Sequence, residues 1–204
     1  MLHAGRPLAD ARLVAILVHG RGASAEDILG LAGEFTATDI AYLAPQARGG
    51  AWYPYSFLAP IEQNEPFLGS ALRRIAEILD EVTRQGVSEN RVALMGFSQG
   101  ACLTLEFAAR HARRFAAVAA FSGGLIGPPG TARDYQGSLD GTPAFIGCSD
   151  VDAHIPLERV QESAEVLRRM GASVDERIYP RMGHTINRDE LLAVDALLTA
   201  IRST

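Results

Sequence analysis

Short apolar runs alternate along the chain with longer segments of helical periodicity. The runs have the length of buried strands and cover residues 13–18, 40–43, 91–95, 116–121, 143–148 and 174–179. In the long segment 65–85, apolar side chains recur every three or four residues, as in an amphipathic helix. Further helices are predicted at three places, namely 100–111, the segment between Pro156 and Gly171, and the segment that follows Asn187.

This alternation predicts an α/β fold, in which helices cover both faces of a mostly parallel sheet. No internal repeat, low-complexity run or linker divides the sequence, and 204 residues are enough to bury one core. We therefore expect a single domain that spans residues 1–204. In such a sheet, functional groups gather at the carboxyl ends of the strands.

The composition narrows the class of protein. A hydrophobic fraction of 48% is typical of a globular domain. The 19 basic and 24 acidic residues give a net charge of −5, which does not favour binding to nucleic acid. The densest basic cluster, residues 110–114, fits the C-terminus of a helix, where positive charge is favourable.

Two cysteines, Cys102 and Cys148, lie in apolar segments and are expected to be buried free thiols of a reducing compartment. The N-terminal residues lack the apolar core of a signal peptide, and the run 13–18 is too short to span a membrane. We therefore expect a cytoplasmic monomer or homodimer without stable membrane insertion. No group of His, Asp, Glu or Cys residues has the spacing of metal ligands, so neither a metal nor another cofactor is expected.

GFSQG, residues 96–100, lies where a predicted strand meets a predicted helix. Gly96 and Gly100 leave room for a sharp turn, and the first backbone amides of the helix face any negative charge near Ser98. A tight turn would by itself explain the glycines. The strand before it and the helix after it favour Ser98 as a nucleophile, in the G-x-S-x-G arrangement of α/β-hydrolases.

A serine nucleophile needs a histidine base, and the chain has five histidines. We expect His3 to lie in a mobile tail, His19 to order the loop after residue 18, His111 to end a helix and His154 to form a local turn. His184 follows the last predicted strand and precedes the last helix, at the same edge of the sheet as Ser98. We therefore predict that His184 is the base.

Asp150 and Asp152 both follow the strand that ends at Cys148, and either could orient His184. Pro156 lies four residues after Asp152. We prefer Asp152, because the proline fixes where the next helix begins, and Asp150 would then cap the turn.

An oxyanion requires two backbone donors. One is expected to be the N–H of Gln99, directly after Ser98, and the other the N–H of Arg21, in a turn where Gly20 and Gly22 allow close approach. The aromatic segment 45–65 is predicted to be a loop. Its side chains either line the substrate site or only anchor the loop to the core; the expected lining residues are Trp52, Tyr53, Phe57 and Leu58.

Several motifs of the chain resemble those of the phospholipase/carboxylesterase family of α/β-hydrolases, small serine esterases that include acyl-protein thioesterases and lysophospholipases. LVHGRGAS is similar to the oxyanion loop of the family, GFSQGA to its nucleophile turn, DAHIP to its acid segment and MGH to its histidine. APQARGGAWYPYSF also resembles a bacterial subgroup of small esterases. The resemblance spans nearly the whole chain and implies a triad of Ser98, Asp152 and His184. It also implies that Arg21 and Gln99 are the oxyanion donors.

The chain departs from the family at the acid, because members commonly have HG-x-x-D and this chain has IGCSDVD. Counting from Gly147 by that pattern gives Asp150, whereas counting back from Pro156 gives Asp152.

The sequence thus predicts a serine hydrolase that cleaves a small-molecule ester or thioester through an acyl-enzyme. One alternative is a binding protein on the same fold, since a fold alone does not establish catalysis. Another is an enzyme like dienelactone hydrolase. That group is expected to use cysteine as the nucleophile, whereas this chain has Ser98 there and Cys102 one turn into the helix.

Overall fold

The computed structural model describes residues 1–201, so the last three residues of the predicted domain lie outside it. One seven-stranded sheet organises the chain. Its strands are β1 (Leu2–Gly5), β2 (Leu13–Val18), β3 (Ile40–Ala44), β4 (Val92–Phe97), β5 (Ala117–Phe121), β6 (Pro143–Ser149) and β7 (Ser173–Tyr179). The helices are α1 (Ala25–Leu29), α2 (Ile61–Asn64), α3 (Phe67–Arg84), α4 (Gln99–Arg110), α5 (Leu157–Arg169) and α6 (Arg188–Ala200). Short 3₁₀ turns cover Leu8–Asp10, Gly30–Glu34, Arg48–Gly50 and Glu89–Arg91.

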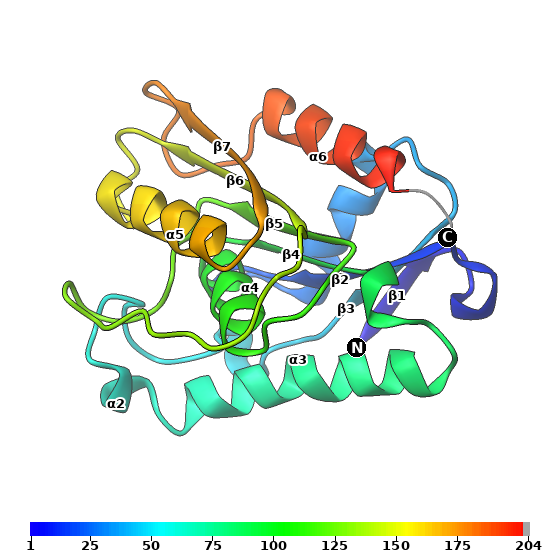
Figure 1. Ribbon diagram of the computed structural model, residues 1–204, viewed down its shortest axis with the longest axis horizontal. Coiled ribbons are helices and arrows are strands. Elements are labelled where there is room, and N and C mark those ends of the chain that lie inside the picture. Colours follow the sequence, from blue (N-terminus) through cyan, green and yellow to red (C-terminus); the bar gives the residue numbers. More distant parts are fainter. Residues whose placement is uncertain (202–204) are drawn as a thin grey trace.

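The sheet has the strand order β1-β3-β2-β4-β5-β6-β7, and every pair except β1 with β3 is parallel. Figure 1 shows α3, α4 and α5 on one face of the sheet and α1 and α6 on the other. Two clusters of buried apolar side chains match these two layers, one between the sheet and α3, α4 and α5, the other between the sheet and α1 and α6. The predicted α/β class and the predicted parallel sheet are confirmed.

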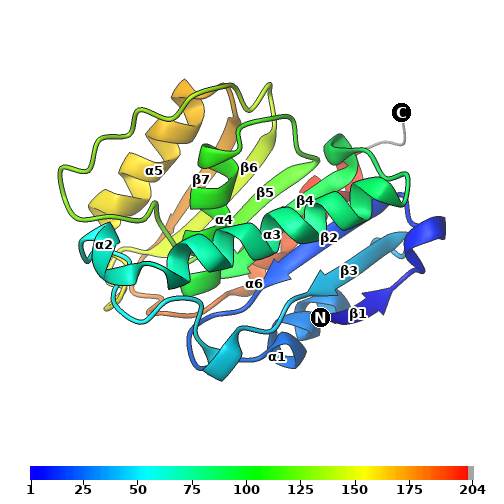
Figure 2. The ribbon, with the colours of Figure 1, turned by 90° about the horizontal axis from the view of Figure 1, so that it is seen from below.

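Strand order reverses between β2 and β4, because the chain leaves β2 for β3 on one side and returns through α3 to β4 on the other. Figure 2 shows α3 lying over the sheet on this return path. The register aligns Val18 with Gly96, Phe97 with Phe121, and Ser149 with Tyr179. The carboxyl ends of these strands therefore meet at one edge, next to the point where ligands bind in open α/β sheets.

The prediction that His3 lies in a mobile tail is wrong. His3 belongs to β1 and pairs with Leu43 in an antiparallel ladder. β1 has only four residues, of which two are exposed, so its sequence carries no apolar run that would predict a strand. Its order comes from pairing with the edge of β3, which sequence periodicity does not reveal.

Candidate active site

Ser98 connects β4 to α4 in a strained backbone conformation, with φ 56° and ψ −120°. Only glycine adopts such angles readily, so the surrounding contacts must hold the turn. A side chain at Gly96 would collide with the backbone of Gly100, and one at Gly100 would collide with the backbone of Val18. The two glycines are therefore required by packing, and they let Ser98 lie above the end of the sheet.

His184 lies in the loop between β7 and α6 and contacts both other members of the predicted triad. Its Nε2 is 2.8 Å from Ser98 Oγ, and its Nδ1 is 2.7 Å from Asp152 Oδ2. Because an ionised carboxylate only accepts hydrogen bonds, Nδ1 carries the proton and Nε2 accepts from the serine hydroxyl. The three side chains thus form one chain of hydrogen bonds.

The side chain of Asp152 is fully buried, and its hydrogen bonds are those that an ionised carboxylate accepts. Its Oδ1 accepts from the backbone N–H groups of His154 and Ile155, at 2.8 and 3.1 Å. Burial raises the pKa of Asp152, but the hydrogen bond from His184 and those two backbone donors together bring the pKa below its ordinary value. The carboxylate is therefore ionised and fixed toward His184.

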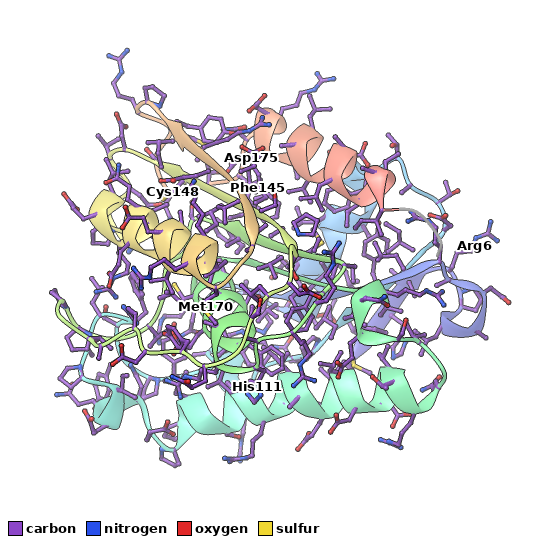
Figure 3. The ribbon with its side chains drawn as sticks, in the orientation of Figure 1. Arg6, His111, Phe145, Cys148, Met170 and Asp175 are labelled. Carbon is purple, nitrogen blue, oxygen red and sulfur yellow. The ribbon has the colours of Figure 1, made fainter. Side chains whose placement is uncertain are left out.

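Cys148, at the end of β6, also lies beside Asp152, with its thiol 3.7 Å from Oδ2. Figure 3 shows Cys148 well separated from His111. His111 directly follows the last residue of α4, and its ring stacks on Phe107. Burial, followed by the negative charge of Asp152, raises the pKa of the Cys148 thiol to about 12. The thiol stays neutral and is available as a weak donor to the carboxylate.

Asp150 has a different environment from Asp152. It is exposed, and its Oδ1 accepts a hydrogen bond from the backbone N–H of Arg181 at 2.7 Å. This contact ties the loop after β6 to the loop that carries His184. The neighbouring Ser149 joins the same two loops, since its Oγ accepts from the N–H of Gly183 at 3.1 Å. The structure thus brings Asp152, and not Asp150, to the imidazole.

Arg21, in the loop after β2, and Gln99, directly after Ser98, both line the cleft in front of Ser98. The turn with Arg21 is fixed by a hydrogen bond from Gly22 N to Gly50 O at 2.8 Å. Gln99 is the first residue of α4. Within residues 1–201, the backbone N–H groups of Arg21 and Gln99 donate to no protein atom. Both are therefore free to bind an oxygen of a ligand.

The side chains of the same two residues hold the aromatic segment 45–65, which we call the aromatic loop. The Arg21 guanidinium donates to Pro54 O and Tyr55 O, at 2.9 and 2.7 Å. The Gln99 side chain donates to Tyr53 O and accepts from a second backbone group of the loop, each at 2.8 Å. The aromatic loop and the turn after Ser98 are thus joined by side-chain hydrogen bonds.

The cleft in front of Ser98 has a volume of about 370 Å³. Its lining residues are Gly20, Arg21, Ala23, Tyr53, Ser56, Phe57, Phe97, Ser98, Gln99, Cys102, His154, Ile155 and His184. Of the four aromatic-loop residues predicted to bind substrate, Tyr53 and Phe57 are among them. Trp52 instead packs on His19 and donates from its Nε1 to His19 O at 2.9 Å, and Leu58 packs against the core. The loop therefore both lines the cleft and anchors itself to the core.

His154 makes a contact that its position in the sequence does not predict. Its backbone forms the expected local turn with Asp152, but its exposed ring packs edge-on against His184, with ring centroids 4.7 Å apart. The spacing of His154 from Asp152 predicts only the turn, because the position of its ring depends on the loop that carries His184. His19 does order its loop, since its Nε2 accepts from the N–H of Ala47 at 3.1 Å.

Cys102 lines the base of the cleft but has the wrong properties for a nucleophile. It lies inside α4, is 1% exposed, and accepts at Sγ from the N–H of Gly124 at 3.4 Å. Burial raises the pKa of the Cys102 thiol to about 12. Since the thiolate is the reactive form of cysteine, these features do not support cysteine chemistry like that expected of dienelactone hydrolases.

Residues 1–201 contain no group of three or more His, Cys, Asp or Glu side chains arranged to hold a metal ion. Within the same residues, each helix is too short or too polar to cross a membrane.

Comparison with known proteins gives a consistent family. Residues 6–201 match the model of the family described as phospholipase/carboxylesterase. A crystal structure of a phospholipase/carboxylesterase from Dyadobacter fermentans has a TM-score of 0.94 and 41% identity, covering 97% of this chain and 95% of that one. The similar curated proteins include a putative esterase, NocK, from Nocardia uniformis, at 31% identity over 76% of this chain and 48% of that protein. Another is acyl-protein thioesterase 1 from Gibberella zeae, at 29% identity over 59% of this chain and 52% of that protein. The chain spans about half the length of the curated relatives it matches.

Proposed function

Because the chain belongs to the phospholipase/carboxylesterase family of α/β-hydrolases, we propose that it hydrolyses carboxylic esters through an acyl-enzyme on Ser98. The observation that carries this proposal is the hydrogen-bonded chain from Ser98 through His184 to Asp152, with distances of 2.8 and 2.7 Å. A binding protein would have no need for a strained serine that is hydrogen-bonded to an oriented imidazole.

In the first step of the proposed reaction, Ser98 Oγ forms a bond to the ester carbonyl carbon while His184 Nε2 takes the hydroxyl proton. The imidazolium that forms is stabilised by the ionised carboxylate of Asp152. The bond to the alcohol oxygen then breaks, and the alcohol leaves with the proton from Nε2. A water molecule attacks the acyl-enzyme by the same route, which releases the acid and restores Ser98.

The carbonyl oxygen becomes negatively charged in both tetrahedral intermediates. We assign its stabilisation to the backbone N–H groups of Arg21 and Gln99, because neither donates to a protein atom in residues 1–201. The first turn of α4 adds the positive end of a helix dipole on the same side. The hydrogen bonds that hold the loops around these donors support a preformed site.

The substrate belongs in the cleft of about 370 Å³ that Tyr53 and Phe57 line. This volume is at the small end for ligand sites and suits a short acyl or aryl group. Esters and thioesters of small acids are both compatible with the proposed chemistry, since each presents the same carbonyl to Ser98.

A fluorophosphonate probe tests the nucleophile directly. We expect one probe adduct on the peptide that contains Ser98, and loss of both labelling and aryl-ester hydrolysis in Ser98→Ala. Ser88→Ala, in an exposed turn away from the cleft, is the matched control and should label like the wild-type protein. Labelling at another residue, or full hydrolysis by Ser98→Ala, would refute the proposal.

A further inference from the structure

The cleft in front of Ser98 is lined by basic side chains and by no acidic one, although the chain as a whole carries a net charge of −5. Its lining includes the basic residues Arg21, His154 and His184, and no Asp or Glu. The acid of the triad, Asp152, has a fully buried side chain. Its oxygens already accept hydrogen bonds from His184 and from two backbone N–H groups. Among the lining residues, therefore, no carboxylate pairs with Arg21.

Arg21 has unused hydrogen-bonding capacity at the rim. Its side-chain hydrogen bonds go to the neutral carbonyls of Pro54 and Tyr55, and in residues 1–201 no carboxylate lies within ion-pair distance of it. Those two contacts use only part of the five N–H donors of a guanidinium. They also fix the group in place, with its carbon 5.9 Å from the centre of the Tyr53 ring. A fixed, unpaired guanidinium is suited to bind a carboxylate.

His154 presents a second polar group close to the reacting atoms. Its ring is exposed, contacts the ring of His184, and in residues 1–201 makes no hydrogen bond through either ring nitrogen. The backbone N–H of His154 donates to Asp152, so the ring is held at a defined place beside His184. An anionic group of a ligand that reaches Ser98 would meet a donor there as well.

We propose that the cleft selects esters that carry a carboxylate, recognised by the side chains of Arg21 and His154. The proposal rests on the ester hydrolysis proposed above and names the class of substrate. Both side chains act here as specificity determinants, separately from the backbone N–H of Arg21. A neutral ester of the same shape would leave the two cationic or donor groups unpaired.

Two pairs of near-isosteric alkyl esters test this preference in a pH-stat. Monoethyl succinate and ethyl levulinate differ in a carboxylate on the acyl side, whereas acetoxyacetate and acetoxyacetone differ in one on the alcohol side. We expect kcat/KM to favour the anionic member of at least one pair by about tenfold or more, the size of one charge-assisted hydrogen bond. The preferred pair shows on which side of the ester the carboxylate is bound. Equal rates, or a preference for the neutral ester in both pairs, would overturn the proposal.

Variants assign the preference to residues. Arg21→Gln and His154→Gln should each reduce the ratio of the two kcat/KM values, whereas Arg21→Lys should keep most of it. Arg48→Gln removes an exposed charge that does not line this cleft and should leave the ratio unchanged. Because Arg21 also holds the aromatic loop, its variants lower both rates, and only the ratio reports recognition. A ratio that neither variant changes would overturn the assignment.

Binding measurements distinguish a failure of this proposal from a failure of the proposed ester hydrolysis. In calorimetry, Ser98→Ala should bind the anionic member of at least one of the two pairs more tightly than the neutral member, and 0.5 M salt should weaken the preference by screening. If the wild-type protein hydrolysed no ester but this binding preference held, the proposed reaction would fail while the recognition would stand. If esters were hydrolysed without any preference in rate or binding, only the recognition would fail.

Discussion

The side-chain oxygen of Gln99 accepts a hydrogen bond from the backbone N–H of Trp52 at 2.8 Å. The other end of the same amide donates to Tyr53 O, also at 2.8 Å, and the side chain is almost fully buried. Gln99 therefore has two parts with different partners. Its backbone N–H, next to Ser98, has no protein acceptor in residues 1–201, and its side chain holds the loop that forms one wall of the cleft.

We predict that Gln99→Ala lowers kcat/KM by up to about 100-fold, because a displaced wall and turn misplace the reacting groups. It should also lower the free energy of unfolding by about 1–3 kcal/mol for each backbone group left unpaired. Gln46→Ala is the matched control, since Gln46 also holds two backbone groups, Ala25 N and Ala47 O, but does not line the cleft. Kinetics and urea unfolding measure both effects. Equal kinetic losses in the two variants would contradict a role for Gln99 in the site.

A second prediction concerns the strain at Ser98. With φ 56° and ψ −120°, any residue with a Cβ is strained there by roughly 1–3 kcal/mol, whereas glycine adopts these angles easily. Ser98→Gly and Ser98→Ala both lose the hydrogen bond to His184, so their difference isolates the strain. We expect Ser98→Gly to be more stable than Ser98→Ala by about 1 kcal/mol, after the entropic cost of glycine. Urea unfolding of both proteins measures this difference, and greater stability of Ser98→Ala would show that the turn is relaxed.

Much of the fold could be predicted from the sequence, because each central strand is a continuous apolar run between helices of clear periodicity. Two short elements, β1 and α1, could not be predicted. β1 has four residues and alternates between half-buried and exposed, so only its pairing with β3 defines it. α1 has five residues and begins with a Ser24 capping box, a local signal too short to show as helical periodicity.

The candidate site could also be predicted only in part. Ser98 and His184 lie next to strand ends, and parallel strands bring such ends together whatever the loops do. The loop residues could not be oriented from the sequence. Trp52 turns toward His19 and away from the cleft, whereas His154 turns toward His184, and both directions depend on contacts between distant segments.

A third prediction uses a buried acid behind the site. Glu190, in the first turn of α6, accepts from the N–H of Asn187 at 2.8 Å through Oε2, while within residues 1–201 its buried Oε1 has no hydrogen-bond partner. Burial raises the pKa of Glu190 from 4.5 to about 7, and the charge of Asp189 adds to the rise. Between these two values the unfolded chain releases the proton and the folded protein keeps it. The contribution of Glu190 to stability is therefore complete below pH 4.5 and is lost as the pH rises through about 7.

Glu190→Gln keeps a side-chain acceptor for Asn187 but cannot ionise. Relative to this variant, the wild-type protein should lose stability between pH 4.5 and 7, by at most about 3 kcal/mol for a pKa shift of that size. Urea unfolding at a series of pH values measures the difference. Glu165→Gln, on the exposed face of α5, should follow the wild-type curve. Parallel curves for the wild-type protein and Glu190→Gln would mean that Glu190 is solvated.

The last prediction separates the two aspartates that follow β6. Asp152 contacts His184 at 2.7 Å, whereas Asp150 accepts only from the N–H of Arg181 among the described residues. Asparagine at position 152 would still fit, but its amide would favour the wrong tautomer of the imidazole and would not stabilise the imidazolium. We therefore expect Asp152→Asn to fold normally and to lose up to about 10⁴-fold in kcat. Asparagine at position 150 still offers an acceptor to the backbone, so Asp150→Asn should keep most of its activity and lose less than about 1 kcal/mol of stability. Steady-state kinetics on one aryl ester, with thermal melts of both variants, decide the matter. If Asp150→Asn were the inactive variant, then Asp150 rather than Asp152 would orient His184 during the reaction, and the loop after β6 would have to rearrange when substrate binds.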